Sequence, residues 1–218
     1  MLYTIVVIVF GWLVYLFKRP RIYGNKQNLK TKGGVIYIAN HRNLLDPVML
    51  AITIPRRVHF MAKKELFEGK VANWFFRSLL VFPVNRKTAD FKSLRQALKL
   101  LEEGHAFGIF PEGRRAVMDE MDDFEKGTAF IASRTEAPIV PIYISPTTYS
   151  GWRRLRMIVG DKIYAKDVLA GCDRRELVDA LTEKMQGDME ALKKRMEEIY
   201  PRKKAKKNAA HPARAKLS

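Results

Sequence analysis

The sequence predicts a single α/β domain with a mainly parallel central sheet flanked by helices. Short apolar runs rich in β-branched residues alternate along the chain with longer segments in which apolar residues recur every three or four positions. Polar motifs directly follow several of the short runs, as happens where parallel strands end at one edge of a sheet. The length of 218 residues is sufficient for one domain with a sizeable core.

An uncharged apolar run at residues 2–17 precedes this domain. As a helix it would reach about 24 Å at about 1.5 Å per residue, against about 30 Å for a hydrocarbon core. We therefore expect residues 1–18 to form an N-terminal membrane-anchoring helix that spans a thinned bilayer or lies in one leaflet. A helix or strand buried in the core is the alternative. Lys18, Arg19 and Arg21 would keep the domain on the cytoplasmic side of the membrane.

The net charge of +17 is concentrated in two segments of the chain. Residues 18–32 hold six basic and no acidic residues, and residues 202–218 hold seven basic and no acidic residues. Flanking segments of this kind fit an anionic membrane lipid surface, whereas a nucleic-acid binder more often carries a basic face on its folded body. We thus expect no nucleic-acid partner, a basic linker at residues 19–33, and a basic, disordered tail at residues 201–218.

Each element of the first half follows from local pattern. The apolar run at residues 36–40 predicts a buried strand, and Asp46-Pro47 predicts the start of a helix, with Asp46 at the N-cap. A second strand is expected at residues 58–62. Residues 63–80 predict a helix whose aromatic stripe either packs in the core or faces lipid or an acyl chain.

The second half continues the alternation. Strands are expected at residues 80–86, 106–110, 137–144 and 156–159, and helices at residues 88–103, 124–134 and 174–200. Gly104 is a good residue to follow the end of the helix at 88–103. Pro141 predicts that its strand lies at an edge or ends there, because proline cannot donate to a sheet.

A histidine stands where the first strand of the domain ends, with a carboxylate five positions later. In one interpretation, Asp46 only caps a helix and His41 is a loop residue. In the other, Asp46 accepts a hydrogen bond from one imidazole nitrogen of His41, which leaves the second nitrogen as a general base. The two interpretations are compatible, since one carboxylate accepts several hydrogen bonds.

Other strands are expected to bring basic side chains to the same edge. Arg86 follows one strand, and Glu112, Gly113, Arg114 and Arg115 follow another. Arginine suits bidentate contact with a phosphate, and a neutral histidine takes a proton from a hydroxyl. Together these residues suggest that a lipid hydroxyl attacks an activated acyl group.

These residues resemble the motifs of the glycerolipid acyltransferases, most closely the 1-acylglycerol-3-phosphate acyltransferases. Asn40-His41-Arg-Asn-Leu-Leu-Asp46 resembles the family's His-x-x-x-x-Asp motif, and three further blocks follow in the family's order. These blocks are Phe82-Pro-Val-Asn-Arg86, Phe110-Pro-Glu-Gly-Arg-Arg115 and Ile139-Val-Pro-Ile142.

The resemblance implies an acyltransferase domain at residues 34–200 that forms phosphatidic acid in phospholipid biosynthesis. It implies catalytic roles for His41 and Asp46, and binding of the acceptor phosphate by Arg86, Glu112 and Arg115. The co-substrates would be a lysophospholipid acceptor, 1-acylglycerol-3-phosphate, and a thioester donor, acyl-CoA or acyl-carrier protein. No metal and no cofactor would be needed.

Three alternatives remain open at this point. Arg114 stands where the family's motif has threonine, so the acceptor is either 1-acylglycerol-3-phosphate or another lysolipid. A non-catalytic, basic protein that binds membrane lipid is the second alternative, although such a protein would be expected to lack His41 or Asp46. A nucleic-acid binder, suggested by the pI of about 10.0, is the third.

Overall fold

The computed structural model describes residues 2–85, 90–115, 121–149, 154–173 and 175–201. The elements are α1 Leu2–Lys18, β1 Arg21–Gly24, η1 Lys26–Lys30, β2 Val35–Ala39, α2 Asp46–Thr53, β3 Val58–Lys63, η2 Lys64–Phe67, α3 Lys70–Ser78, β4 Val81–Val84, α4 Phe91–Glu102, β5 Ala106–Ile109, α5 Lys126–Ser133, β6 Ile139–Ile144, η3 Pro146–Tyr149, β7 Arg156–Val159, α6 Ala165–Leu169 and α7 Leu177–Ile199.

A seven-stranded sheet forms the centre of the domain, in the order β1-β7-β6-β2-β5-β3-β4. Neighbouring strands are parallel except β6 and β7, which are antiparallel. The predicted α/β fold with a mainly parallel sheet is therefore confirmed. Because β2, β4, β5 and β6 run in one direction, the loops that follow them meet at the same edge of the sheet.

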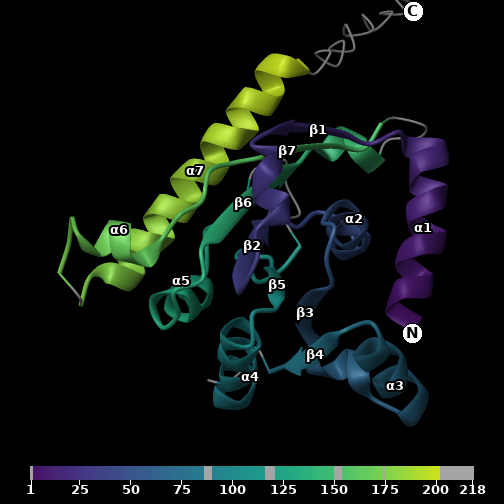
Figure 1. Cartoon of the computed structure of the whole chain (residues 1–218), viewed down its shortest axis with the longest axis horizontal. Helices are drawn as coiled ribbons and strands as arrows, with labels where there is room; N and C mark the ends of the chain where they lie inside the picture. The colour runs from purple at the N-terminus through teal and green to yellow at the C-terminus, as the bar shows by residue number, and fades with distance from the viewer. Residues whose placement is uncertain (1, 86–89, 116–120, 150–153, 174, 202–218) are drawn as a thin grey trace, which may run out of the picture.

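Helices cover both faces of the sheet, so β2 is buried on both sides (Figure 1). Ile36 and Ile38 pack into one core with buried residues of α4, α5 and α7. Tyr37 and the other alternate residues of β2 pack into a second core with residues of α1 and α2. Burial on both faces explains why this strand is a continuous apolar run.

The long C-terminal helix confirms its predicted stripe. Apolar residues of α7 from Leu177 to Met196 are buried, and they pack on the face of the sheet that α5 also covers. Ile199 lies one step beyond and is 40% exposed. The helix thus packs on the domain, as its spacing predicts.

The expected linker at residues 19–33 instead contains two elements. β1 pairs with β7 at the edge of the sheet, and Leu29 of η1 is buried. The backbone N–H of Arg21 donates to the carbonyl of Leu155 at 2.8 Å, and that of Asn25 donates to the carbonyl of Val159 at 2.8 Å. The prediction was wrong because β1 is a short strand whose only large apolar residues are Ile22 and Tyr23, and these two side chains pack against the two cores of the domain.

Pro141 lies inside the sheet, so the prediction of an edge or strand end was wrong. β6 has β2 on one side and β7 on the other. The carbonyl of Pro141 accepts from the N–H of Gly160 at 2.8 Å, and Asn28 Nδ2 donates to the carbonyl of Gly160 at 2.8 Å. The carbonyl of Gly160 lies opposite Pro141, which has no N–H to donate to it, and the side chain of Asn28 donates to this carbonyl instead. Pro141 is therefore tolerated in an interior strand.

The predicted helix at residues 63–80 is broken into η2 and α3. Gly69, just before α3, has φ +84°, a conformation that favours glycine. Val71, Trp74 and Phe75 on α3 are 79%, 62% and 42% exposed, so these members of the stripe do not pack in the core.

The N-terminal run forms α1, which packs beside α2 (Figure 1). Tyr3 and Val14 are its buried residues, and the Tyr3 hydroxyl accepts from the N–H of Val58 at 3.1 Å. Most of its other apolar side chains are exposed, including Ile8 at 64% and Trp12 at 65%, so the alternative of a core helix is wrong. In the part of the chain that the structure describes, no helix has both the length and the apolar character needed to cross a membrane.

Candidate active site

Asn40 determines where the chain leaves β2. Its side chain is buried and bridges to the end of β6, with Nδ2 donating to the Ile144 carbonyl at 3.1 Å and Oδ1 accepting from the Ile144 N–H at 2.7 Å. The pair of hydrogen bonds joins the start of the loop after β2 to the last residue of β6. The sequence pattern indicated only that the strand ends at Asn40.

His41 and Asp46 are in direct contact. His41 Nδ1 lies 2.9 Å from Asp46 Oδ2, and the Asp46 residue is 1% exposed. Oδ2 also accepts from the backbone N–H groups of Arg42 and Asn43, each at 2.7 Å. A carboxylate that accepts from Nδ1 leaves Nε2 without a proton in the neutral ring.

Asp46 is not the N-cap of α2, contrary to the prediction. The N-cap residue is Leu45, and Asp46 is the first residue of the helix. Its carboxylate turns back toward the preceding loop, where the N–H groups of Arg42 and Asn43 need acceptors. The same side chain therefore shapes the loop and holds the imidazole.

Tyr149 completes the surroundings of the Asp46 carboxylate. It is the last residue of η3, and its hydroxyl donates to Asp46 Oδ1. Burial raises the pKa of Tyr149 far above its ordinary value of 10.0, and the negative charge of Asp46 raises it further. Sequence reasoning missed this residue, because 103 positions separate it from Asp46 and no local pattern marks it.

Glu112 and Phe110 hold His41 from the end of β5. The N–H of His41 donates to Glu112 Oε1 at 2.9 Å, and the imidazole stacks on the Phe110 ring with centroids 4.2 Å apart. Glu112 is 3% exposed, and burial raises the pKa of its carboxyl group, an effect that the N–H groups of His41 and Asp122 oppose. The observed contacts of this carboxylate are with backbone amides, so it positions the loop that carries His41.

Of the basic residues predicted to lie at this edge of the sheet, the structure describes Arg114 and Arg115. Arg114 Nε lies 2.9 Å from Asp122 Oδ2, and its side chain is 72% exposed. Gly113 turns the chain with φ +66°, and Arg115, two residues later, is exposed. Arg86 lies outside the described residues.

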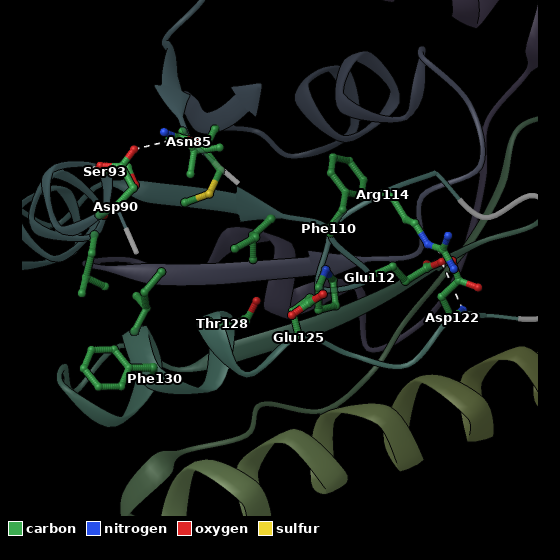
Figure 2. A pocket seen from close by; sticks show the side chains of 18 of the residues that line it. Asn85, Asp90, Ser93, Phe110, Glu112, Arg114, Asp122, Glu125, Thr128 and Phe130 are labelled. Carbon is green, nitrogen blue, oxygen red and sulfur yellow. Dashed lines mark hydrogen bonds and ion pairs between the residues drawn. The ribbon is translucent and has the colours of Figure 1, made fainter. Parts of the chain in front are cut away.

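A pocket of about 850 Å³ opens beside Phe110 and Glu112 (Figure 2). Apolar side chains from β4, β5, α4 and α5 line part of it, including Leu94, Ile109 and Phe130. Figure 2 shows Arg114 and Asp122 at the end near Glu112, with Phe130 further along. The pocket therefore joins an apolar wall to the polar edge where His41 lies.

Asp90 supports the far side of this pocket. Its Oδ2 accepts from the N–H of Asn85 at 2.8 Å, and its Oδ1 accepts from the N–H groups of Lys92 and Ser93, which makes it the N-cap of α4. These backbone hydrogen bonds, that from Asn85 foremost, lower the pKa of Asp90. An aspartate just before a helical pattern often marks the N-terminus of a helix, so the sequence alone could have identified Asp90 as the N-cap of α4.

The described residues include no group of three or more histidine, cysteine, aspartate or glutamate side chains able to hold a metal ion.

Comparison with known proteins gives three findings. The family model described as Acyltransferase matches residues 21–145. The 1-acyl-sn-glycerol-3-phosphate acyltransferase of Bacillus subtilis (strain 168) is 31% identical over 182 residues, which cover 80% of this chain and 89% of that protein. The protein of the same name from Streptococcus pneumoniae is 29% identical over 175 residues, which cover 78% of this chain and 64% of that protein.

A solved structure has the same fold. The crystal structure of the 1-acyl-sn-glycerophosphate (LPA) acyltransferase from Thermotoga maritima superimposes with a TM-score of 0.67 at 24% identity. The alignment covers 90% of this chain and 79% of that one.

Proposed function

This chain belongs to the acyltransferase family, and from that premise we propose that it transfers a fatty acyl group from a thioester to the free hydroxyl of 1-acylglycerol-3-phosphate. The product is phosphatidic acid. The observation that carries the proposal is the 2.9 Å contact between His41 Nδ1 and the buried Asp46 carboxylate at the edge of a parallel sheet.

His41 is the proposed general base. Its Nε2 takes the proton of the acceptor hydroxyl while the hydroxyl oxygen attacks the thioester carbonyl carbon. The tetrahedral intermediate then collapses, the carbon–sulfur bond breaks, and the leaving sulfur receives the proton from the imidazolium. Asp46 stabilises the imidazolium, and a base of this kind contributes about 10²- to 10⁴-fold.

The proposed site for the acceptor phosphate consists of Arg86, Gly113, Arg114 and Arg115. Glu112 contributes to this site indirectly, because its carboxylate accepts from the N–H groups of His41 and Asp122. Arg114 keeps one side of its guanidinium on Asp122, which orients the group while most of the side chain stays exposed. The apolar wall of the adjacent pocket suits a hydrocarbon chain. The proposed donor is acyl-CoA or acyl-carrier protein, used as a co-substrate, and no further cofactor is invoked.

A panel of acceptors tests this proposal. Wild type, His41→Ala and His105→Ala are incubated with labelled acyl-CoA or acyl-carrier protein and 1-acylglycerol-3-phosphate. We expect His41→Ala to lose at least about 10²-fold in kcat. His105 is half-exposed and lies at the opposite end of β5, so His105→Ala serves as the matched control and should keep wild-type kcat. Normal turnover by His41→Ala would remove His41 from the mechanism.

A second acceptor class is a different lysolipid. The observation that favours it is Arg114, which stands where the family's motif has threonine and is paired with Asp122. The same panel includes lysophospholipids with larger head groups. Faster acylation of one of these than of 1-acylglycerol-3-phosphate would change the proposed acceptor and leave the reaction type intact.

We also propose that the protein is associated with an anionic membrane, with the catalytic domain on the cytoplasmic side. α1 has 17 residues and reaches about 26 Å at about 1.5 Å per residue, so we propose that it lies in one leaflet. The exposed apolar residues of α1 and α3 support this proposal, as do the basic residues of the segment 18–32.

Vesicle binding tests the membrane proposal. Wild type should sediment with phosphatidylglycerol vesicles more than with phosphatidylcholine vesicles, and less at high salt. Trp12→Glu should weaken binding, because Trp12 is 65% exposed on α1, whereas Leu181→Met in the buried stripe of α7 should not. Equal sedimentation of Trp12→Glu and wild type would contradict the proposed role of α1.

A further inference from the structure

The second oxygen of the Asp46 carboxylate has a partner of its own. Oδ2 accepts from His41 and from two backbone amides of the same loop, whereas Oδ1 accepts from the Tyr149 hydroxyl. We propose that Tyr149 is a positioning residue, which holds Oδ1 so that Oδ2 remains on His41 Nδ1. This inference rests on the proposed function of His41 and Asp46 and extends it to a residue of η3.

The segment that carries Tyr149 is well supported. The side chain of Thr148 is buried, and its Oγ1 accepts from the N–H of Arg156 at 3.3 Å. The N–H of Thr148 donates to the Ser145 carbonyl at 3.0 Å, and its carbonyl accepts from Lys18 Nζ at 3.1 Å. Bonds to β7, to α1 and within its own turn therefore fix the position from which Tyr149 reaches Asp46.

Tyr149 can act on Asp46 only as a donor near neutral pH. Burial and the neighbouring charge of Asp46 raise the pKa of its hydroxyl, so the hydroxyl keeps its proton while His41 changes protonation state. The donor role is therefore available at every step of the proposed reaction. A hydrogen bond to a charged acceptor is among the stronger ones in proteins.

Loss of this hydroxyl would act on His41 through the carboxylate. The Asp46 side chain is 1% exposed, so water reaches Oδ1 poorly once the phenol oxygen is gone. The carboxylate would then turn about its Cβ–Cγ bond to seek other donors, and Oδ2 would leave Nδ1 in part of the population. In those molecules the imidazole proton is free to sit on Nε2, where it blocks proton transfer from the acceptor hydroxyl.

Tyr149→Phe is the direct test, since it removes one oxygen and keeps the ring. We expect kcat to fall about 10- to 100-fold, the loss of one hydrogen bond to a charged group, with KM for donor and acceptor unchanged. The matched control is Tyr37→Phe. Tyr37 is fully buried in the same core, and its hydroxyl donates to the Leu29 carbonyl at 3.0 Å, so its loss should lower stability and leave kcat unchanged.

A histidine spectrum supplies a second readout that does not depend on turnover. In ¹⁵N spectra of the full chain with labelled histidine, the His41 signals are those absent from His41→Gln. Wild type should show Nδ1 protonated and Nε2 unprotonated, and Tyr149→Phe should show a mixture of the two tautomers. Tyr37→Phe should match wild type.

The outcomes separate this inference from the proposed function. If wild type fails to acylate 1-acylglycerol-3-phosphate, the proposed function fails, while the tautomer mixture in Tyr149→Phe still decides the role of Tyr149. Wild-type kcat together with a wild-type spectrum in Tyr149→Phe would overturn the inference. An equal loss of kcat in the two phenylalanine variants would overturn it as well, because the effect would then be one of general stability.

Discussion

Two substitutions, Asp46→Ala and Asp46→Asn, distinguish the structural role of Asp46 from its proposed catalytic role. The carboxylate accepts four hydrogen bonds, from His41 Nδ1, from the N–H groups of Arg42 and Asn43, and from the Tyr149 hydroxyl. Alanine would leave these donors without their acceptor in a place where Asp46 is 1% exposed. Each buried donor left unsatisfied costs about 1–3 kcal/mol, and a domain is stable by about 5–15 kcal/mol in total. We therefore expect Asp46→Ala to lose most of its stability.

Asp46→Asn is expected to fold. Its amide oxygen can take the place of Oδ2 and accept from the loop amides and from His41 Nδ1, and its NH₂ group can donate to the Tyr149 oxygen. What it lacks is the negative charge that stabilises the imidazolium. Hydrogen bonds to a charged group contribute about 1.5–3 kcal/mol, against about 0.5–1.5 kcal/mol for neutral pairs. The loss of kcat should thus be about five- to tenfold.

Both variants are measured by denaturant unfolding and by initial rates of acyl transfer at saturating substrate. Wild-type stability in Asp46→Ala would show that the carboxylate does not hold the loop. Wild-type kcat in a folded Asp46→Asn would refute the pairing of charge between Asp46 and His41.

Four further substitutions test packing and pH dependence. Gly108→Ala should lose about 1–3 kcal/mol of stability, because the new Cβ would lie 2.3 Å from Phe60 Cε1. Gly187→Ala on α7, where nothing lies within 4 Å of the new Cβ, should gain about 0.5–1 kcal/mol; equal melting temperatures for the two variants would contradict this. His59 has a pKa below its ordinary value of 6.5, chiefly through burial, so the stabilisation present above pH 6.5 is lost as pH falls through that lowered pKa. Unfolding of His59→Asn should depend less on pH below 6.5, and an unchanged pH dependence would exclude His59 as the cause. Glu112 has a pKa above its ordinary value of 4.5, chiefly through burial, so wild type loses stability as pH rises through that raised pKa. Glu112→Gln, which keeps an acceptor for the His41 N–H, should gain stability relative to wild type as pH rises above 4.5; a constant difference in unfolding free energy would contradict this.

The sequence was sufficient to predict a helix or strand where the periodicity of that element's own apolar residues reflects how it is buried. The stripe of α7 and the apolar run of β2 were both predicted because burial of one helix face, or of both strand faces, leaves a periodic trace in the residues themselves. The segment at 19–33 was misjudged because β1 has only four residues, too few for a periodic apolar pattern, and its pairing with β7 joins residues far apart in the chain.

Pro141 shows a second limit. Its tolerance in β6 depends on Asn28, more than a hundred positions earlier, whose side chain serves the carbonyl of Gly160. A rule about proline in strands describes the residue alone, whereas the hydrogen bond that makes it acceptable comes from another element.

The sequence by itself determined the fold class, the strand that ends at Asn40 and the pair of His41 and Asp46, because these follow from periodicity and from spacing within a single loop. Only the tertiary structure decided that Tyr149 reaches the second oxygen of Asp46 and that Glu112 takes the N–H of His41. Those contacts depend on which strands are neighbours, and the order β6-β2-β5 arises from packing of the whole chain. One of these hydrogen bonds joins residues that are 71 positions apart in the chain, and the other joins residues 103 positions apart. Neither can therefore be predicted from local sequence before the order of the strands is known.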